Sequence, residues 1–187
     1  MKTLSQVGGT TLIFSVASSI PSYQVSSLLL PKQACKKLDA MNRNFWWGYK
    51  EENKKGCCLK SWDSIYTPKC VGGLGIKKTE DMNKALVAKM TLEVASNVGR
   101  LWVKVFNKKY VRSKKFMRMS VPKAASWSCQ SIIGGRKVIK KGLCHRIGNG
   151  LNTWIWEDPW IPNEPRLIPQ VKSGVTCEAY LVADLID

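Results

Sequence analysis

Apolar side chains recur at helical spacing over most of the chain up to residue 142. The first run falls on one side of a helix, at offsets of one, four, five and eight residues, and consists of Leu12, Ile13, Val16, Ala17 and Ile20. This spacing predicts an amphipathic helix. Thr10 or Thr11 would cap it, and Pro21 would end it because the residue before a proline is pushed out of the helical region.

Two more helices are expected before residue 48. A short one runs from Ser22 to Leu30. The next begins near Pro31, because a proline in the first helical turn loses no intrahelical hydrogen bond. This third helix presents one face at helical period, made of Cys35, Leu38, Met41, Asn42, Phe45 and Trp46.

Glycine interrupts the segment that follows. Residues 48–57 are polar and charged, which is typical of an exposed loop. Residues 68–76 have the sequence Pro-Lys-Cys-Val-Gly-Gly-Leu-Gly-Ile. Phosphate-binding loops are also rich in glycine, but here no Lys-Ser/Thr follows and the spacing fits neither nucleotide-binding motif. A tight packing corner is therefore the favoured interpretation.

Helical spacing resumes at Thr79, which is expected to cap a helix that ends before Gly99. Glu80 and Asp81 would lie in its first turn, where negative charge interacts favourably with the helix dipole. The expected apolar stripe of this helix is Met82, Ala85, Leu86, Met90 and Val94.

Two further helices complete the helical part. One is expected from Arg100 to about Tyr110, and another after a cap at Ser126. Gly134 and Gly135 would weaken or kink the latter. The apolar side of the helix that starts at Arg100 is expected to be Leu101, Trp102, Val105 and Phe106.

The last part of the chain is patterned differently. Asn149-Gly150 stands between two β-prone runs, which is a strong short-range signal for a hairpin. The predicted fold class is mainly α, a helical bundle with one small β-hairpin near the C-terminal third. The expected segments are a helical hairpin (residues 1–48), a basic loop with a Gly-rich turn (49–76), a basic helical segment (77–142), the β-hairpin with a Pro/Trp segment (143–162) and a loosely ordered tail (163–187).

Charge adds a functional expectation. The chain holds 30 Lys and Arg against 13 Asp and Glu, a net charge of +17, and no acidic residue lies between Glu93 and Glu157. Four cations recur every fourth residue from Arg100 to Arg112, and a bound phosphate backbone would relieve their mutual repulsion. A merely solvated face is the alternative. The candidate nucleic-acid-binding residues are Arg100, Lys104, Lys108, Lys109, Arg112, Lys114, Lys115, Arg118, Arg136, Lys137, Lys140, Lys141 and Arg146.

Cysteine and histidine argue against a metal site. The seven cysteines include no C-x-x-C pair, and His145 is the single histidine, so the paired ligands of a zinc site are missing. Free thiols in a reducing intracellular compartment are expected, with the nucleus as one candidate location. Residues 3–31 carry no charge and resemble a signal peptide, whereas the alternative we favour is a pair of core helices.

The carboxylates do not form a recognisable catalytic set. Two-metal phosphoryl transfer needs several of them converging on the ions. The adjacent acidic pairs fall in a lysine-rich loop, in a helix's first turn and before Pro159, so we predict no catalytic residue, no metal and no cofactor. Trp46, Trp47, Trp127, Trp154, Trp156 and Trp160 could stack on bases, although most are expected to be core residues.

Several strings, in this order, resemble the region after the polymerase domain in plant LINE-type (non-LTR) retrotransposon polyproteins. They span roughly residues 4–165 and include Thr11-Leu12-Ile13, Ser18-Ser19-Ile20-Pro21-Ser22-Tyr23, Leu30-Pro31-Lys32, Phe45-Trp46-Trp47-Gly48, Trp62, Pro68-Lys69, Gly72-Gly73-Leu74-Gly75-Ile76, Asn83-Lys84-Ala85-Leu86, Ala88-Lys89, Lys108-Lys109-Tyr110, Ser126-Trp127, Gly135-Arg136, Lys141-Gly142, Arg146-Ile147-Gly148-Asn149-Gly150 and Trp156-Glu157-Asp158-Pro159-Trp160-Ile161-Pro162.

The resemblance implies a position between the reverse transcriptase palm and a zinc-binding segment followed by ribonuclease H. Residues 1–48 would then be thumb-like, and the region would guide a template–primer duplex. This sequence departs from the family pattern by losing cations or large rings, so we expect weaker affinity. The departures are Val7-Gly8-Gly9, Phe14 for a lysine, Cys129-Gln130 for Trp-Arg and His145 for a tryptophan.

Two hypotheses follow for the function. In the first, the chain is a non-catalytic fragment of a reverse transcriptase that binds the phosphate backbone of RNA or DNA without sequence preference, with no membrane and no small-molecule substrate. In the second, it is a decayed structural fragment without a selected partner. An active polymerase or nuclease would need a further domain.

Overall fold

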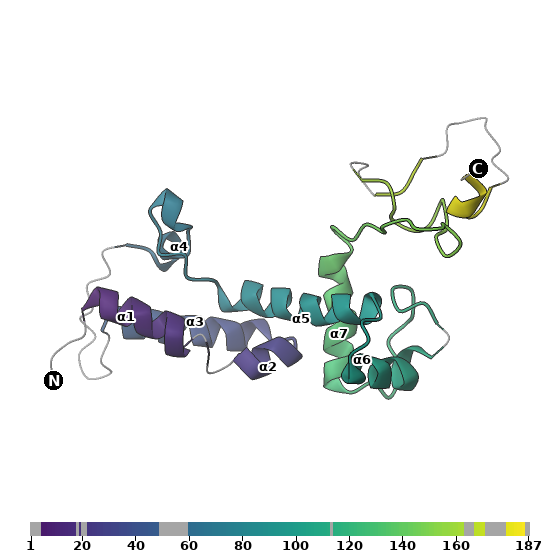
Figure 1. Cartoon of the computed structure of the whole chain (residues 1–187). Coiled ribbons are helices and arrows are strands. Elements are labelled where there is room, and N and C mark those ends of the chain that lie inside the picture. The colour runs from purple at the N-terminus through teal and green to yellow at the C-terminus, as the bar shows by residue number, and fades with distance from the viewer. Residues whose placement is uncertain are drawn as a thin grey trace. The chain divides into compact units, whose positions relative to one another are not determined.

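The computed structural model (Figure 1) describes residues 5–17, 19, 22–48, 60–112, 114–162, 167–170 and 179–185. Over these residues the chain is mainly α, as the sequence predicted. It divides into two compact units, Met1–Ile139 and Lys140–Asp187. The α-helices are α1 (Gln6–Leu12), α2 (Ser22–Ser27), α3 (Lys32–Trp46), α4 (Trp62–Ile65), α5 (Thr79–Ala95), α6 (Leu101–Phe106) and α7 (Trp127–Ile139), and the shorter turns are η1 (Ile13–Ala17), η2 (Lys69–Val71), η3 (Asn107–Val111) and η4 (Val182–Leu185).

Helix α1 begins earlier than predicted. The Ser5 hydroxyl accepts a hydrogen bond from the Gly8 amide at 3.2 Å and caps the helix. Thr10 and Thr11 lie inside it, where their hydroxyls donate to the carbonyl oxygens four residues earlier. The predicted cap at Thr10 or Thr11 is therefore wrong, because Ser5 already satisfies the first free amides. The predicted end at Pro21 lies outside the described residues.

Helix α3 starts directly after Pro31, as predicted, but its apolar face is only partly covered. Cys35 is buried, whereas Met41 is 65% and Phe45 48% exposed. The helix contacts α5, α1 and η1. These neighbours leave part of the predicted stripe in solvent.

The first hydrophobic cluster joins the N-terminal helices to the Gly-rich corner. The Trp46 indole nitrogen donates to the Thr10 hydroxyl at 2.9 Å. At the corner, the Gly75 amide donates to the Thr67 carbonyl at 3.0 Å, and a Cβ at Gly73 would overlap that same carbonyl. The glycines thus permit close packing, as the packing-corner interpretation predicted. The cluster consists of buried Ile13, Ile65 and Ile76 with half-buried Trp46, Trp47, Trp62, Tyr66 and Leu74.

Helix α5 runs from the N-terminal helices to α6 and α7 (Figure 1). Its N-terminus is capped from another helix. The Asp39 carboxylate of α3 accepts hydrogen bonds from the Thr79 amide at 3.2 Å and from the Thr79 hydroxyl at 2.6 Å. The predicted cap at Thr79 is therefore wrong, because Thr79 is the first helical residue and Asp39 takes the capping role. Glu80 and Asp81 do lie in the first turn.

The buried face of α5 is rotated from the predicted one. Asn83, Val87, Ala88, Thr91 and Val94 are buried, while Met82, Leu86 and Met90 are only half-buried and Ala85 is exposed. The reason is the hydrogen bonding of Asn83, because its side-chain amide faces inward and binds backbone groups of the α2 segment. Its Nδ2 donates to the carbonyls of Val25 and Leu28, and its Oδ1 accepts from the Leu30 amide.

Helix α6 buries the expected Phe106 but not the expected Leu101 and Val105. Leu101 and Val105 are 78% and 56% exposed, whereas Val103 and Phe106 are buried. The π-helical turn η3 then places Val111 in the core. Phe106 and Val111 join a second cluster, which contains buried Val94, Phe106, Val111, Phe116, Met119, Cys129, Ile132 and Ile133.

Helix α7 is capped by Ser126, as predicted, whose hydroxyl accepts from the Cys129 amide at 3.3 Å. The helix continues through Gly134 and Gly135 to Ile139. A Cβ at Gly135 would overlap the Thr91 hydroxyl of α5. The glycine that we expected to weaken α7 instead permits its close crossing with α5, the most extensive helix contact in this unit.

The hairpin predicted at Asn149-Gly150 does not form within described residues 143–162. The chain does turn there, with a φ of 70° at Gly150. Within residues 143–162 the segments directly before and after this turn do not pair with each other. The His145 amide donates to the Pro159 carbonyl, and Trp154 forms an isolated antiparallel bridge with Leu181. Backbone bonds of this kind, between loop segments, help to hold the second unit together.

Candidate nucleic-acid interface

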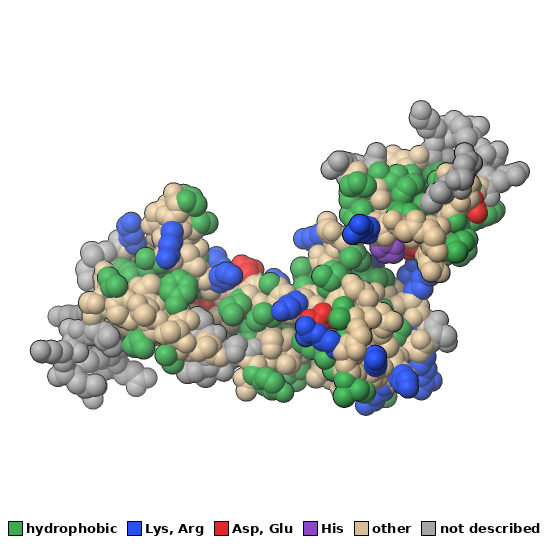
Figure 2. All heavy atoms as spheres, viewed as in Figure 1, with side chains coloured by type: hydrophobic (Ala, Val, Ile, Leu, Met, Phe, Trp, Pro, Cys, Tyr) green, Lys and Arg blue, Asp and Glu red, His purple; other side chains and the backbone are tan. Residues whose placement is uncertain are grey.

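The cations of the acid-free stretch surround the second hydrophobic cluster. Phe106 packs against Tyr110 and Phe116, with ring centroids 5.1 and 6.3 Å apart. This buried aromatic group fixes the backbone of α6, η3 and the loop that follows. Figure 2 shows Lys and Arg side chains gathered over α6 and the turn after it. The exposed cations of this part are Lys104, Lys108, Lys109, Arg112, Lys114, Lys115, Arg118 and Lys123.

The expected four-residue stripe is only partly formed. Arg100 is the N-cap residue of α6, and its Nη1 lies 3.4 Å from a Glu93 carboxylate oxygen, so a nearby anion offsets its charge. Lys104 and Lys108 are exposed and continue the stripe. Arg112 follows the π-helical turn and has a φ of 53°, so it does not continue the four-residue spacing of an α-helix.

Arg136 differs from the other candidates because it is half-buried. Its Nη1 donates to the carbonyls of Phe116 at 2.9 Å and Met119 at 2.7 Å, and its Nε donates to Ile133. The guanidinium also lies over the Phe116 ring, 5.7 Å from its centroid. Burial lowers the pKa of Arg136, but a guanidinium remains charged. Arg136 therefore holds the 116–119 loop against α7.

The remaining candidates lie in different places. Lys137 is exposed in the last turn of α7, where a cation interacts favourably with the helix dipole. Lys140, Lys141 and Arg146 belong to the second unit and are exposed there. The first unit therefore holds a group of cations independent of these three.

A groove of about 610 Å³ lies beside η3, and the sequence reasoning missed it. Three cations line it, Lys109, Arg112 and Lys114, together with the ring of Tyr110. No acidic residue is among the described lining residues. A helical stripe cannot reveal such a groove, because it forms only when the loop after η3 folds back on the cluster.

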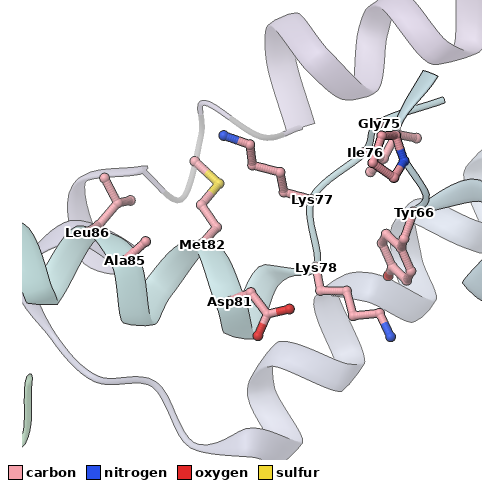
Figure 3. Close-up of a pocket in the computed structure, with 10 residues that line it drawn as sticks. Tyr66, Gly75, Ile76, Lys77, Lys78, Asp81, Met82, Ala85 and Leu86 are labelled. Atoms are coloured by element: carbon pink, nitrogen blue, oxygen red, sulfur yellow. The ribbon is translucent and has the colours of Figure 1, made fainter. Parts of the chain in front are cut away.

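A larger hollow of about 690 Å³ lies along α5 (Figure 3) and has a different character. Its lining is largely apolar, and it includes Asp81. Of its two cations, Lys78 is already paired with Asp63 at 2.8 Å. The acid-free groove beside η3 is thus the better site for a polyanion.

The prediction that most of the tryptophans are core residues holds only in part: four of the eight lie in the clusters, and of the six stacking candidates Trp154 is exposed and Trp156 and Trp160 are half-buried. Trp46, Trp47, Trp62 and Trp102 pack against buried residues. Trp127, at the start of α7, is 54% exposed. It follows Ser126, whose Oγ accepts a hydrogen bond from the Tyr110 hydroxyl at 3.1 Å. An exposed indole therefore follows, in the sequence, the residue that hydrogen-bonds Tyr110 of the groove.

Several carboxylates of the described residues have structural roles. Glu80 pairs with Lys84, and Asp158 accepts a hydrogen bond from the Trp154 amide at 3.0 Å. No group of three or more His, Cys, Asp or Glu side chains in the described ranges is arranged to hold a metal ion. Within the same ranges no helix is both long and apolar enough to span a membrane.

Comparison with known proteins gives two relatives in Arabidopsis thaliana. The chain is 35% identical over 189 aligned residues to the protein named "Putative ribonuclease H protein At1g65750", an alignment that covers 98% of the chain but 30% of that protein. It is 33% identical over 152 residues to "Uncharacterized mitochondrial protein AtMg00310", covering 81% of the chain and 98% of that protein. The chain thus spans about a third of the first relative and nearly all of the second. No family model and no solved structure matches it.

Proposed function

This chain belongs to the family of the uncharacterized mitochondrial protein AtMg00310 of Arabidopsis thaliana, and from that premise we propose that it is a non-catalytic nucleic-acid-binding fragment derived from a retrotransposon reverse transcriptase polyprotein. The ordered strings of the LINE-type region support this origin. The name of the longer relative, a ribonuclease H protein, supports it independently.

The observation that carries the binding proposal is the acid-free surface over α6, η3 and the following loop. Lysines and arginines there neutralise phosphates and release counterions, which is the main source of sequence-independent affinity. The second hydrophobic cluster holds the backbone between these cations rigid. The partner is RNA or DNA, contacted through its phosphate backbone.

The proposal is tested by the salt dependence of binding. A mixed-sequence 20-base-pair duplex, followed by fluorescence anisotropy, should give log K against log salt with a slope of roughly −4 to −5 if about five phosphates are neutralised. The double variant Lys104→Ala/Lys108→Ala should flatten that slope by about two units, since each lysine contributes about one.

The matched control removes the same charge from another exposed helix. Lys36 and Lys37 are exposed on α3, and the pKa of Glu80 is lowered chiefly by its hydrogen bond to Lys84 and to a smaller extent by the charges of Lys32 and Lys36. Lys36→Ala/Lys37→Ala should therefore change the slope less. Equal losses from both double variants would mean that net charge alone drives binding. No measurable binding by the unaltered chain would favour the decayed-fragment hypothesis.

Catalysis is not part of the proposal. The adjacent carboxylates Glu80 and Asp81 lie in the first turn of α5, and Asp158 is occupied by a backbone amide. We expect neither primer extension nor ribonuclease H cleavage with magnesium or manganese, because no convergent carboxylate set is found among the described residues. Turnover that disappears when the chain's own carboxylates are replaced would overturn this expectation.

A further inference from the structure

The groove beside η3 has the size and chemistry of a nucleotide site. Its volume of about 610 Å³ lies within the range of about 300–1,000 Å³ that is usual for pockets that enclose small ligands. One part of its lining is cationic, with Lys109, Arg112 and Lys114. The rest is aromatic, apolar or weakly polar, and consists of Tyr110, Val111, Met119, Ser120, Pro122 and Ala124.

These two kinds of lining match the two ends of one nucleotide. Ammonium and guanidinium groups bind a phosphate, while aromatic and apolar side chains accept the face of a base. In a duplex the bases are stacked and paired, so only the backbone and the groove edges are accessible. In a single strand the base can turn out of the stack and enter a pocket together with its phosphate.

Arg112 has an unusual backbone for a residue that lines the groove. Its φ of 53° and ψ of −122° lie in a region that residues with a Cβ rarely adopt. The conformation is held by a hydrogen bond of 2.7 Å from its amide to the Asn107 carbonyl, and by burial of Val111 next to it. A charged residue kept in a disfavoured conformation at the edge of a groove points to a functional constraint.

Tyr110 supplies the aromatic ring of this site, and an exposed tryptophan follows its hydrogen-bond partner in the sequence. The Lys109 ammonium lies 5.1 Å from the centroid of the Tyr110 ring, and the Tyr110 hydroxyl donates to Ser126. Trp127 follows Ser126 and is 54% exposed.

We infer that this groove binds one unpaired nucleotide, with its phosphate at Lys109, Arg112 and Lys114, and that the chain consequently prefers single-stranded nucleic acid to duplex. The inference rests on the proposed nucleic-acid-binding function and adds the substrate class. It assigns Lys104 of α6 and Lys108 of η3 to general backbone contact and the groove to strand selection.

The test compares a 20-nucleotide single strand with the duplex of the same sequence, at one salt concentration. The unaltered chain should bind the single strand about tenfold more tightly, which is the gain expected from stacking of one base. Arg112→Gly removes the cation and also suits the positive φ, so its thermal unfolding temperature should stay the same or rise. Its affinity for the single strand should fall about tenfold and that for the duplex by about twofold.

Two further variants serve as controls. The first removes cations from the groove without changing the backbone, and the second removes a charge that lies outside the groove. Lys109→Ala/Lys114→Ala should show the same selective loss with the backbone of Arg112 unchanged. Lys123→Ala removes an exposed cation nearby that does not line the groove, and it should lower both affinities equally. If Arg112→Gly and the double lysine variant lower the affinity for the single strand and for the duplex by the same factor, the inference is overturned.

The two proposals fail in different ways. If the duplex binds with the expected salt slope but the single strand binds no more tightly, only the groove assignment is wrong. If neither ligand binds at low salt, the nucleic-acid-binding function itself is wrong and the groove assignment falls with it.

Discussion

Arg136 donates to three backbone carbonyls, those of Ile133, Phe116 and Met119, and its guanidinium covers the Phe116 ring. In the sequence it stands beside Lys137 as one more cation of the basic stretch. Its neighbour is exposed, whereas Arg136 is half-buried. Two adjacent positive charges on one helix therefore have different roles, and sequence alone cannot separate them because the 116–119 carbonyls become partners only in the folded chain.

This difference predicts a large loss of stability for one substitution and almost none for the other. Arg136→Ala leaves two loop carbonyls without their charged donor and should lower the free energy of unfolding by about 2–3 kcal/mol. Lys137→Ala removes the same charge from solvent and should change it by less than about 0.5 kcal/mol. Urea unfolding followed by circular dichroism measures both. Similar values for the two variants would contradict the structural role of Arg136.

The cysteines give a second prediction at this scale. Cys35 and Cys129 are buried, and burial raises the pKa of both thiols above the ordinary value. Cys70 and Cys144 are exposed. A raised pKa leaves less reactive thiolate at a given pH, and burial also blocks the reagent. Iodoacetamide at pH 8 should therefore modify Cys70 and Cys144 well before Cys35 and Cys129. Peptide mass spectrometry measures the order of modification. Rapid modification of Cys129 would mean that α7 does not pack against the rest of the first unit.

At the scale of elements, the crossing of α5 and α7 organises the first unit. Thr91 of α5 lies against Gly135 of α7, and its hydroxyl donates to the Ile132 carbonyl at 2.8 Å. On the other part of α5, Asn83 binds the α2 segment. Buried polar groups on one helix thus fix the positions of two others.

Gly135 and Gly134 provide a matched pair for testing this crossing. In an exposed helix, Gly→Ala stabilises by about 1 kcal/mol. A Cβ at Gly135 would overlap Thr91, so Gly135→Ala should instead destabilise by about 1–3 kcal/mol. At Gly134 the nearest atom is the flexible end of Leu29, 2.7 Å from an added Cβ, so Gly134→Ala should be close to neutral. Equal stabilisation of both variants in thermal unfolding would show that the helices do not approach closely here.

The elements also show how far the sequence could be interpreted. Helical period located α3, α5, α6 and α7, because it depends on local spacing alone. It did not give the rotation of α5, because Asn83 and Thr91 are buried for hydrogen bonds to distant segments and not for their hydrophobicity. The cap of α5 by Asp39 joins residues 40 positions apart and has no local signal. The groove needs the π-helical turn and the folded loop, so only its cations were predicted.

At the scale of the whole molecule, positive charge is unevenly distributed. The chain carries a net charge of +17, and its stretch without acidic residues extends from residue 94 to residue 156. Within the described residues, the ion pairs Lys78–Asp63, Lys84–Glu80 and Arg100–Glu93 lie outside that stretch or at its edge. Most of the basic surface therefore has no acidic neighbour along the chain. Compaction brings these charges together and costs free energy through mutual repulsion.

This repulsion predicts two opposite salt dependences for one protein. Without nucleic acid, raising NaCl from about 20 to about 300 mM should raise the melting temperature, because screening weakens repulsion between exposed cations. Exposed ion pairs such as Lys78–Asp63 are also screened, but such pairs contribute little to stability, so the repulsion should dominate. With a saturating oligonucleotide, the melting temperature should instead be highest at low salt, because binding stabilises the folded state and weakens as salt rises. Differential scanning fluorimetry of the same sample with and without oligonucleotide measures both curves. If the melting temperature of the free chain falls with salt, attraction between unlike charges outweighs the repulsion. If the melting temperature with oligonucleotide changes with salt in the same way as without it, the oligonucleotide does not bind the folded chain.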